Sequence, residues 1–141
     1  MRTMRVAYML APVLLLATSL HAENVAQISY GCAPWDGQSL EITVGAPDIV
    51  YNLTIWGKGY EALRQGKKNV HLSATGGFDG DGRSSVCGTR RDGAACHPEA
   101  LAVSFALIEW TSGGTVAGQI DFKGMTVPFS GAMGTSREPC G

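Results

Sequence analysis

The chain lacks the residue patterns that usually reveal catalysis or metal binding. It contains three histidines, and His21 falls in an N-terminal apolar segment, so only His71 and His97 remain for acid–base chemistry near neutral pH. No Cys-x-x-Cys pair and no Gly-x-Ser-x-Gly elbow occurs, which argues against a structural zinc site and against a serine hydrolase of the elbow type. The sequence therefore predicts no catalytic residue, no metal and no cofactor.

A strongly basic surface is also missing. Eleven Lys and Arg stand against twelve Asp and Glu, for a formal net charge of −1. Residues 1–22 hold two of the arginines and no acid, so the rest of the chain has nine basic against twelve acidic residues, or −3. Nucleic acids and anionic membrane surfaces attract basic proteins. We therefore expect neither nucleic acid nor a membrane surface as a partner.

The longest apolar run is too short to cross a membrane. It spans residues 6–20, is interrupted by Pro12 and follows Arg2 and Arg5, whereas a spanning helix needs about 20 apolar residues. This pattern, ending at the small residue Ala22, predicts a signal peptide over residues 1–22, with cleavage after Ser19 as the alternative. We expect a periplasmic or secreted protein with one domain, residues 23–141, and no membrane span.

Four cysteines follow the predicted cleavage site, an even number that is typical of disulfides in small exported domains. Three pairings are open to them. Cys87 and Cys96 flank eight residues that contain glycines and the Asp92-Gly93 turn, so that a short loop can fold back on itself. We predict a Cys87–Cys96 bond and a Cys32–Cys140 bond, the latter joining the first strand to the tail.

Alternation of apolar and polar residues indicates β-structure. Nineteen glycines punctuate the chain, as in short strands joined by tight turns. Apolar residues recur at every second position and are expected to face inward in three strands: Leu40, Ile42 and Val44; Val70, Leu72 and Ala74, with His71 and Ser73 outward; and Leu101, Val103, Phe105 and Leu107. A helical turn fits only residues 60–65 and 98–100, and Pro128 is typical of an edge or bulged strand. We expect an all-β domain, a single small antiparallel sandwich or barrel stapled by two disulfides, with strands at 25–32, 40–44, 49–56, 69–75, 101–110, 115–122 and 125–130.

Residues 76–95 are interpreted as one long polar loop that the Cys87–Cys96 bond constrains. Its stretch Asp79-Gly80-Asp81-Gly82 is similar to the start of a calcium loop, but no acid closes it, and a glycine-rich hairpin tip is favoured. A constrained loop loses less entropy when a partner binds. Together with two tryptophans beside predicted turns, this loop predicts a binding site at Arg83, Arg90, Arg91, Asp92, Trp35 and Trp110.

A purely structural loop is the alternative at residues 76–95, and it remains open. Trp56 lies in a predicted strand that is rich in β-branched residues, so we expect it in the core.

Tyr30-Gly31-Cys32, a short polar turn and the strand at residues 40–44 resemble the Tyr-x-Cys start of the small periplasmic inhibitors of c-type lysozyme. The resemblance implies a disulfide-bonded β-barrel that plugs the active site of a wall-cleaving enzyme. The resemblance extends no further along the chain, because the serine-containing inhibitory loop of that family has no counterpart in this sequence. Periplasmic immunity proteins share the size, compartment and disulfides.

Three classes of function follow. We favour an exported inhibitor or immunity protein that neutralises a cell-wall-cleaving enzyme by plugging its active site, so that the partner is a peptidoglycan-degrading enzyme or toxin. The alternative is a secreted module that binds a small ligand or carbohydrate without catalysis. An enzyme without a recognisable motif is the third class, and the oligomeric state is left open.

Overall fold

The computed structural model describes residues 23–67, 69–88, 95–135 and 140. In this part of the chain it contains nine strands and one helix, α1 (Gly57–Arg64), in place of the expected turn at 60–65. The strands are β1 (Asn24–Cys32), β2 (Gln38–Ala46), β3 (Ile49–Ile55), β4 (Val70–Ala74), β5 (Gly82–Gly88), β6 (Cys96–Pro98), β7 (Leu101–Ile108), β8 (Thr115–Phe122) and β9 (Met125–Ala132).

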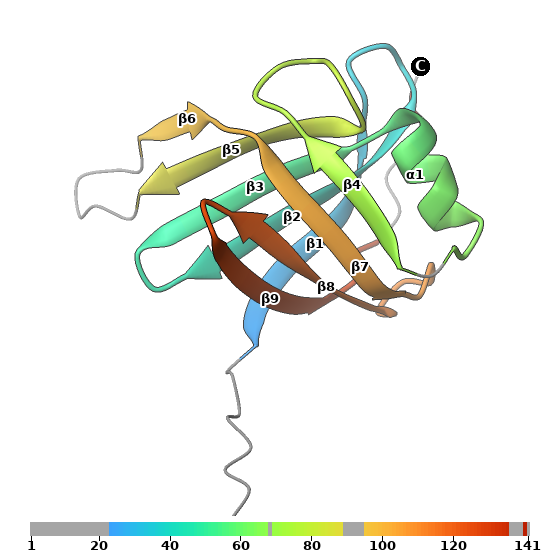
Figure 1. The fold of residues 1–141 in the computed structure, drawn as a ribbon. Coiled ribbons are helices and arrows are strands. Elements are labelled where there is room, and N and C mark those ends of the chain that lie inside the picture. Colours follow the sequence, from blue (N-terminus) through green and yellow to red (C-terminus); the bar gives the residue numbers. More distant parts are fainter. Residues whose placement is uncertain (1–22, 68, 89–94, 136–139, 141) are drawn as a thin grey trace, which may run out of the picture.

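All nine strands belong to one sheet in the order β4-β7-β8-β9-β1-β2-β3-β5-β6. Every pairing is antiparallel except that of β1 with β9. The sheet curls around one interior, and α1 lies beside β4 at one end (Figure 1). The predicted all-β class is confirmed.

The curl brings β4, at one edge of the sheet, against β5 near the other edge. The Thr75 backbone N–H donates to the Gly82 carbonyl at 3.1 Å, and the Ser84 backbone N–H donates to the Thr75 carbonyl at 2.7 Å. The Ser84 hydroxyl donates to the Ala74 carbonyl at 2.8 Å and also lies against the Thr75 and Glu99 carbonyls. These bonds close one rim of the curled sheet.

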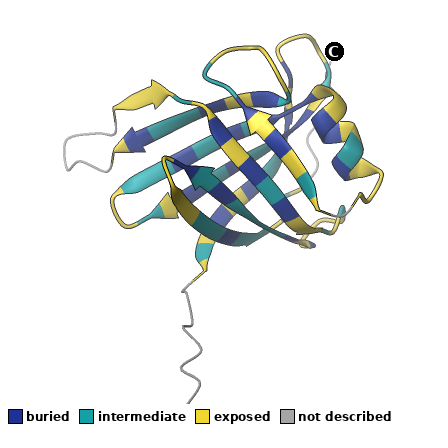
Figure 2. Cartoon of the chain, in the orientation of Figure 1, coloured by how far each residue is buried: buried dark blue, intermediate teal, exposed yellow. Residues whose placement is uncertain are grey.

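The interior is filled by the residues that the alternation predicted. Leu40, Ile42 and Val44 are at most 1% exposed, and Leu72 and Ala74 point inward while His71 and Ser73 point outward. Figure 2 shows buried and exposed positions alternating along the strands. Trp56, at 2% exposed, is buried as expected.

Both predicted disulfides are present. Cys32 and Cys140 have Cα atoms 5.6 Å apart, and Cys87 and Cys96 are register partners in β5 and β6. Two disulfides are typical of proteins that fold in an oxidising compartment outside the cytosol. Over the described ranges, no helix has the length and apolar character needed to span a bilayer.

The prediction of a single loop over residues 76–95 is wrong. Strand β5 runs through its middle, and β6 occupies residues 96–98 and so includes the first residue of the helical turn considered at 98–100. The alternation was hidden because the inward positions of β5 include Gly82 and Ser84, which are small but buried. A Cβ at Gly82 would collide with the Thr54 carbonyl of β3, so only glycine lets the two strands approach this closely.

Two further expectations fail locally. Leu107 is 45% exposed although it continues the alternation of β7, because a β-bulge between Phe105 and Leu107 reverses the facing. Pro128 does not mark an edge, since β9 lies between β8 and β1. The parallel pairing with β1 starts at Phe129, one residue later, so that it does not require a backbone N–H from Pro128.

Candidate functional site

A row of aromatic side chains runs along the closed rim. Trp35 comes from the β1–β2 loop, Trp56 precedes α1, and Phe78 comes from the β4–β5 loop; both loops project from the same end of the sheet (Figure 1). Trp56 lies between the other two, with ring centroids 5.3 Å from Trp35 and 6.4 Å from Phe78. Trp35 and Phe78 are each 56% exposed. We call Trp35, Trp56, Phe78 and Arg83 the aromatic ridge.

Arg83 completes the ridge as an exposed residue near the start of β5. Its guanidinium carbon lies 5.5 Å from the centroid of the Phe78 ring, within the range of a cation–π contact. The side chain that follows the buried Gly82 therefore faces outward beside an exposed aromatic ring, with its charge available to solvent or to a partner.

Backbone hydrogen bonds fix the loops that carry the ridge. The Ala33 N–H donates to the Gly37 carbonyl at 2.6 Å, and the Trp56 N–H donates to the Asp81 carbonyl at 2.9 Å. In the β4–β5 loop, the Thr75 hydroxyl donates to the Asp79 carbonyl at 2.9 Å. Trp35 and Phe78 are thus presented by loops tied to the sheet and to α1.

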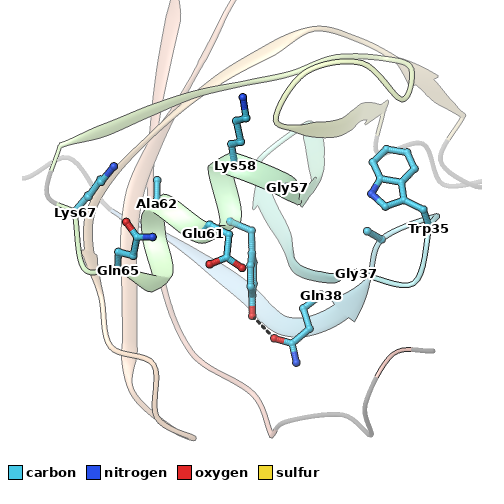
Figure 3. Close-up of a pocket in the computed structure, with 11 residues that line it drawn as sticks. Trp35, Gly37, Gln38, Gly57, Lys58, Glu61, Ala62, Gln65 and Lys67 are labelled. Carbon is cyan, nitrogen blue, oxygen red and sulfur yellow. Dashed lines mark hydrogen bonds between the residues drawn. The ribbon is translucent and has the colours of Figure 1, made fainter.

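A cleft of about 780 Å³ opens beside the ridge, between the β1–β2 loop and α1. Figure 3 shows Trp35 on one side of it and Lys58, Glu61 and Gln65 of the helical segment on the other. The Tyr60 hydroxyl donates to Gln38 Oε1 at 2.9 Å across the cleft. The lining residues are Ala33, Trp35, Gly37, Gln38, Gly57, Lys58, Tyr60, Glu61, Ala62, Gln65 and Lys67.

Trp110 belongs to a different cluster. Its ring meets the Tyr60 ring with centroids 5.4 Å apart, and its indole N–H donates to the Leu63 carbonyl at 3.1 Å. The Arg64 guanidinium covers its face at 5.0 Å. The half-buried Trp110 therefore anchors α1 to the sheet, and burial raises the pKa of its neighbour Tyr60.

The structure brings together only part of the predicted binding site. Trp35 and Arg83 lie on one ridge, joined through Trp56 and Phe78, whereas Trp110 packs under α1. The Cys87–Cys96 bond lies about 13 Å further along β5 than Arg83. Arg90, Arg91 and Asp92 lie outside the described residues.

Sequence reasoning missed Phe78 and the cleft. Phe78 stands among glycines and aspartates in a stretch that looked like a plain turn. Its large aromatic side chain could have indicated a binding residue, because a tight turn does not require an aromatic side chain. Gln38, Glu61 and Gln65 belong to no recognisable sequence motif, and only the folded chain brings them to the same cleft.

A serine–histidine pair lies elsewhere, on the outer face of β4 and β7. Ser104 Oγ and His71 Nδ1 are 2.6 Å apart, beside a hollow of about 330 Å³ that Glu23 and Gln119 also line. Among the described residues no carboxylate is hydrogen-bonded to His71, so the third member that orients a catalytic imidazole is missing there. The pair is exposed and forms a cross-strand contact.

Comparison of the chain with protein-family models, with curated proteins and with solved structures finds no significant match. Function is therefore inferred from the ridge, the cleft and the charges around them.

Proposed function

We propose that the protein is an exported inhibitor or immunity protein that binds a cell-wall-cleaving enzyme and plugs its active site, without catalysis of its own. The observation that carries this proposal is the aromatic ridge. Trp35 and Phe78 are each 56% exposed, yet both rest on the buried Trp56. Rigid exposed aromatics lose little entropy on binding and are the usual anchors of protein interfaces.

The charges beside the ridge suit such a partner. Enzymes that cleave glycan chains use a pair of carboxylates in a cleft. Arg83 of the ridge and Lys58, which lines the cleft beside it, offer exposed positive charge. An arginine can bind a carboxylate through two parallel hydrogen bonds. The residues that resemble the lysozyme inhibitors, Tyr30 to Cys32 and Leu40 to Val44, lie on the two strands that flank the loop carrying Trp35.

Purified peptidoglycan hydrolases test the proposal: a c-type lysozyme, a lytic transglycosylase and a wall amidase. The protein is expected to inhibit lysis of cell walls by at least one of them. The double variant Trp35→Ala/Phe78→Ala should then bind that enzyme at least thirtyfold more weakly, which corresponds to about 2 kcal/mol.

The matched control is Val25→Ala. Val25 is 81% exposed, the highest value among the large apolar residues in the described part of the chain. It lies near the start of β1, more than about 20 Å along the strand from the loop that carries Trp35. Equal affinity of the double variant and the control, or failure to inhibit all three hydrolases, contradicts the proposal.

A further inference from the structure

The cleft beside the ridge holds polar side chains that docking through the ridge leaves unused. Gln38, Glu61 and Gln65 line it and are exposed, while its other lining residues include Ala33, Gly37 and Gly57, which have no long side chains. The volume of about 780 Å³ lies within the range of small-molecule sites, about 300 to 1,000 Å³. The cleft therefore has room for a ligand as well as groups to orient it.

One wall of the cleft is flat and apolar. The Trp35 indole is held edge-on by Trp56, with the ring planes at 67°, so that its orientation is set before any ligand arrives. A sugar ring has one apolar face of C–H groups and a rim of hydroxyls that both donate and accept hydrogen bonds. An exposed, prearranged indole matches the apolar face of such a ring.

The opposite wall matches the hydroxyl rim. The Glu61 carboxylate accepts hydrogen bonds, and the Gln65 amide both donates and accepts them. Gln38 Oε1 is already occupied by the Tyr60 hydroxyl at 2.9 Å, which orients the amide and leaves its NH₂ group to donate (Figure 3). Glu61 and Gln65 of the helical segment and Gln38 at the start of β2 thus supply both donors and acceptors to the lining of the cleft.

The charges of the residues that line the cleft nearly balance, with a net charge of +1. Glu61 contributes one negative charge, and Lys58 and Lys67 contribute two positive charges, all on exposed side chains. Among the lining residues there is no arginine to bind an anionic group in bidentate fashion.

We propose that this cleft is a binding site for a neutral oligosaccharide, in which Trp35 stacks on a sugar ring while Gln38, Glu61 and Gln65 hydrogen-bond its hydroxyls. The site does not depend on the inhibitory function proposed above. Because Trp35 belongs to both the ridge and the cleft, a bound saccharide and a protein docked on the ridge exclude one another.

Calorimetric titration of the exported protein tests this site. The probes are β-1,4-linked trisaccharides of N-acetylglucosamine, glucose and mannose, with trigalacturonate as the charged comparison. At least one neutral trisaccharide should bind with a Kd of about 1 mM or tighter and should change the tryptophan fluorescence. Glu61→Ala, Gln38→Ala and Trp35→Ala should each weaken binding about tenfold or more.

Phe78→Ala and Arg83→Gln are the matched controls, because both residues lie on the ridge but outside the cleft. Both variants should bind saccharide as tightly as the wild type. If they bind saccharide normally but no longer inhibit a hydrolase, the result bears on the inhibitory function and not on the saccharide site. Circular dichroism verifies the fold of each variant, and Trp35→Phe, which keeps an aromatic platform, should retain part of the affinity. The site is refuted if no neutral trisaccharide binds, if trigalacturonate binds best, or if Glu61→Ala and Gln38→Ala bind like the wild type.

Discussion

Trp35 stands edge-on against Trp56, with ring centroids 5.3 Å apart and ring planes at 67°. The two indoles are in contact, but Trp35 is 56% exposed and Trp56 only 2%. The buried Trp56 packs in the core, and the exposed Trp35 is available to a partner. We therefore expect Trp56 to contribute mainly to stability and Trp35 mainly to binding.

Trp56→Ala should cost about 3 to 5 kcal/mol of unfolding free energy, because it leaves a cavity under the ridge. Trp35→Ala should cost less than about 1 kcal/mol of unfolding free energy, as is usual for exposed positions, while it weakens binding at both the ridge and the cleft. Denaturant unfolding of the two variants measures the difference. Similar losses of stability would mean that Trp35 is a core residue.

Ser84→Ala should destabilise the fold by about 1 to 3 kcal/mol. Ser84 is 3% exposed, and its hydroxyl donates to the Ala74 carbonyl at the point where β4 meets β5, so the substitution removes a buried hydrogen bond. Ser73→Ala, on the exposed face of β4, is the control and should change little. Amide hydrogen exchange at Thr75 and Ser84 should accelerate in Ser84→Ala alone; unchanged exchange would show that the rim does not depend on this hydroxyl.

Alkaline pH should weaken the fold through Tyr60. Burial raises the pKa of Tyr60 above the ordinary 10.0, with Arg64 lowering it and Tyr30 and Glu61 raising it to a smaller extent. The fold favours the neutral phenol of Tyr60. The stability that this preference contributes is therefore complete below pH 10, and it is lost as the pH rises through the pKa of Tyr60 in the folded state. Unfolding free energy measured across alkaline pH should fall less steeply in Tyr60→Phe. An identical slope in both proteins would contradict this.

The two disulfides should contribute unequally. Cys32 and Cys140 are 108 residues apart in sequence, and Cys87 and Cys96 only 9. The chain-entropy model gives about 4.7 kcal/mol for the long loop and about 2.7 kcal/mol for the short one. Denaturant unfolding should rank Cys32→Ser/Cys140→Ser below Cys87→Ser/Cys96→Ser, after non-reducing peptide mapping has verified both pairs. The reverse ranking would contradict the entropic account.

Replacing His71 and His97 together by alanine should leave folding and binding largely intact. The hydrogen bond of His71 to Ser104 is exposed, and its loss should cost about 1 kcal/mol or less. Circular dichroism, thermal unfolding and the hydrolase inhibition assay provide the measurements. Lost function with an unchanged spectrum would point to an enzyme.

The sequence predicted the elements whose side chains alternate between large apolar and polar. Leu40 to Val44 shows this pattern openly, and the even cysteine count with one short spacing predicted both bonds. Strand β5 was not predicted because its inward positions include the small residues Gly82 and Ser84. These residues are buried because a neighbouring strand lies close to them. The ridge was not predicted for a related reason. Trp35 and Phe78 both contact Trp56 only once the sheet has curled, and the local sequence pattern contains no information about such long-range contacts.

The Cys32–Cys140 bond also determines how the domain bears mechanical load. Tension applied between the start of β1 and the C-terminal residue passes along β1, through the disulfide and out at Cys140. The chain between these two cysteines, which holds the ridge and the cleft, lies off that covalent path. A domain tethered at both ends would therefore keep its binding surface intact under forces that peel apart sheets without such a bond.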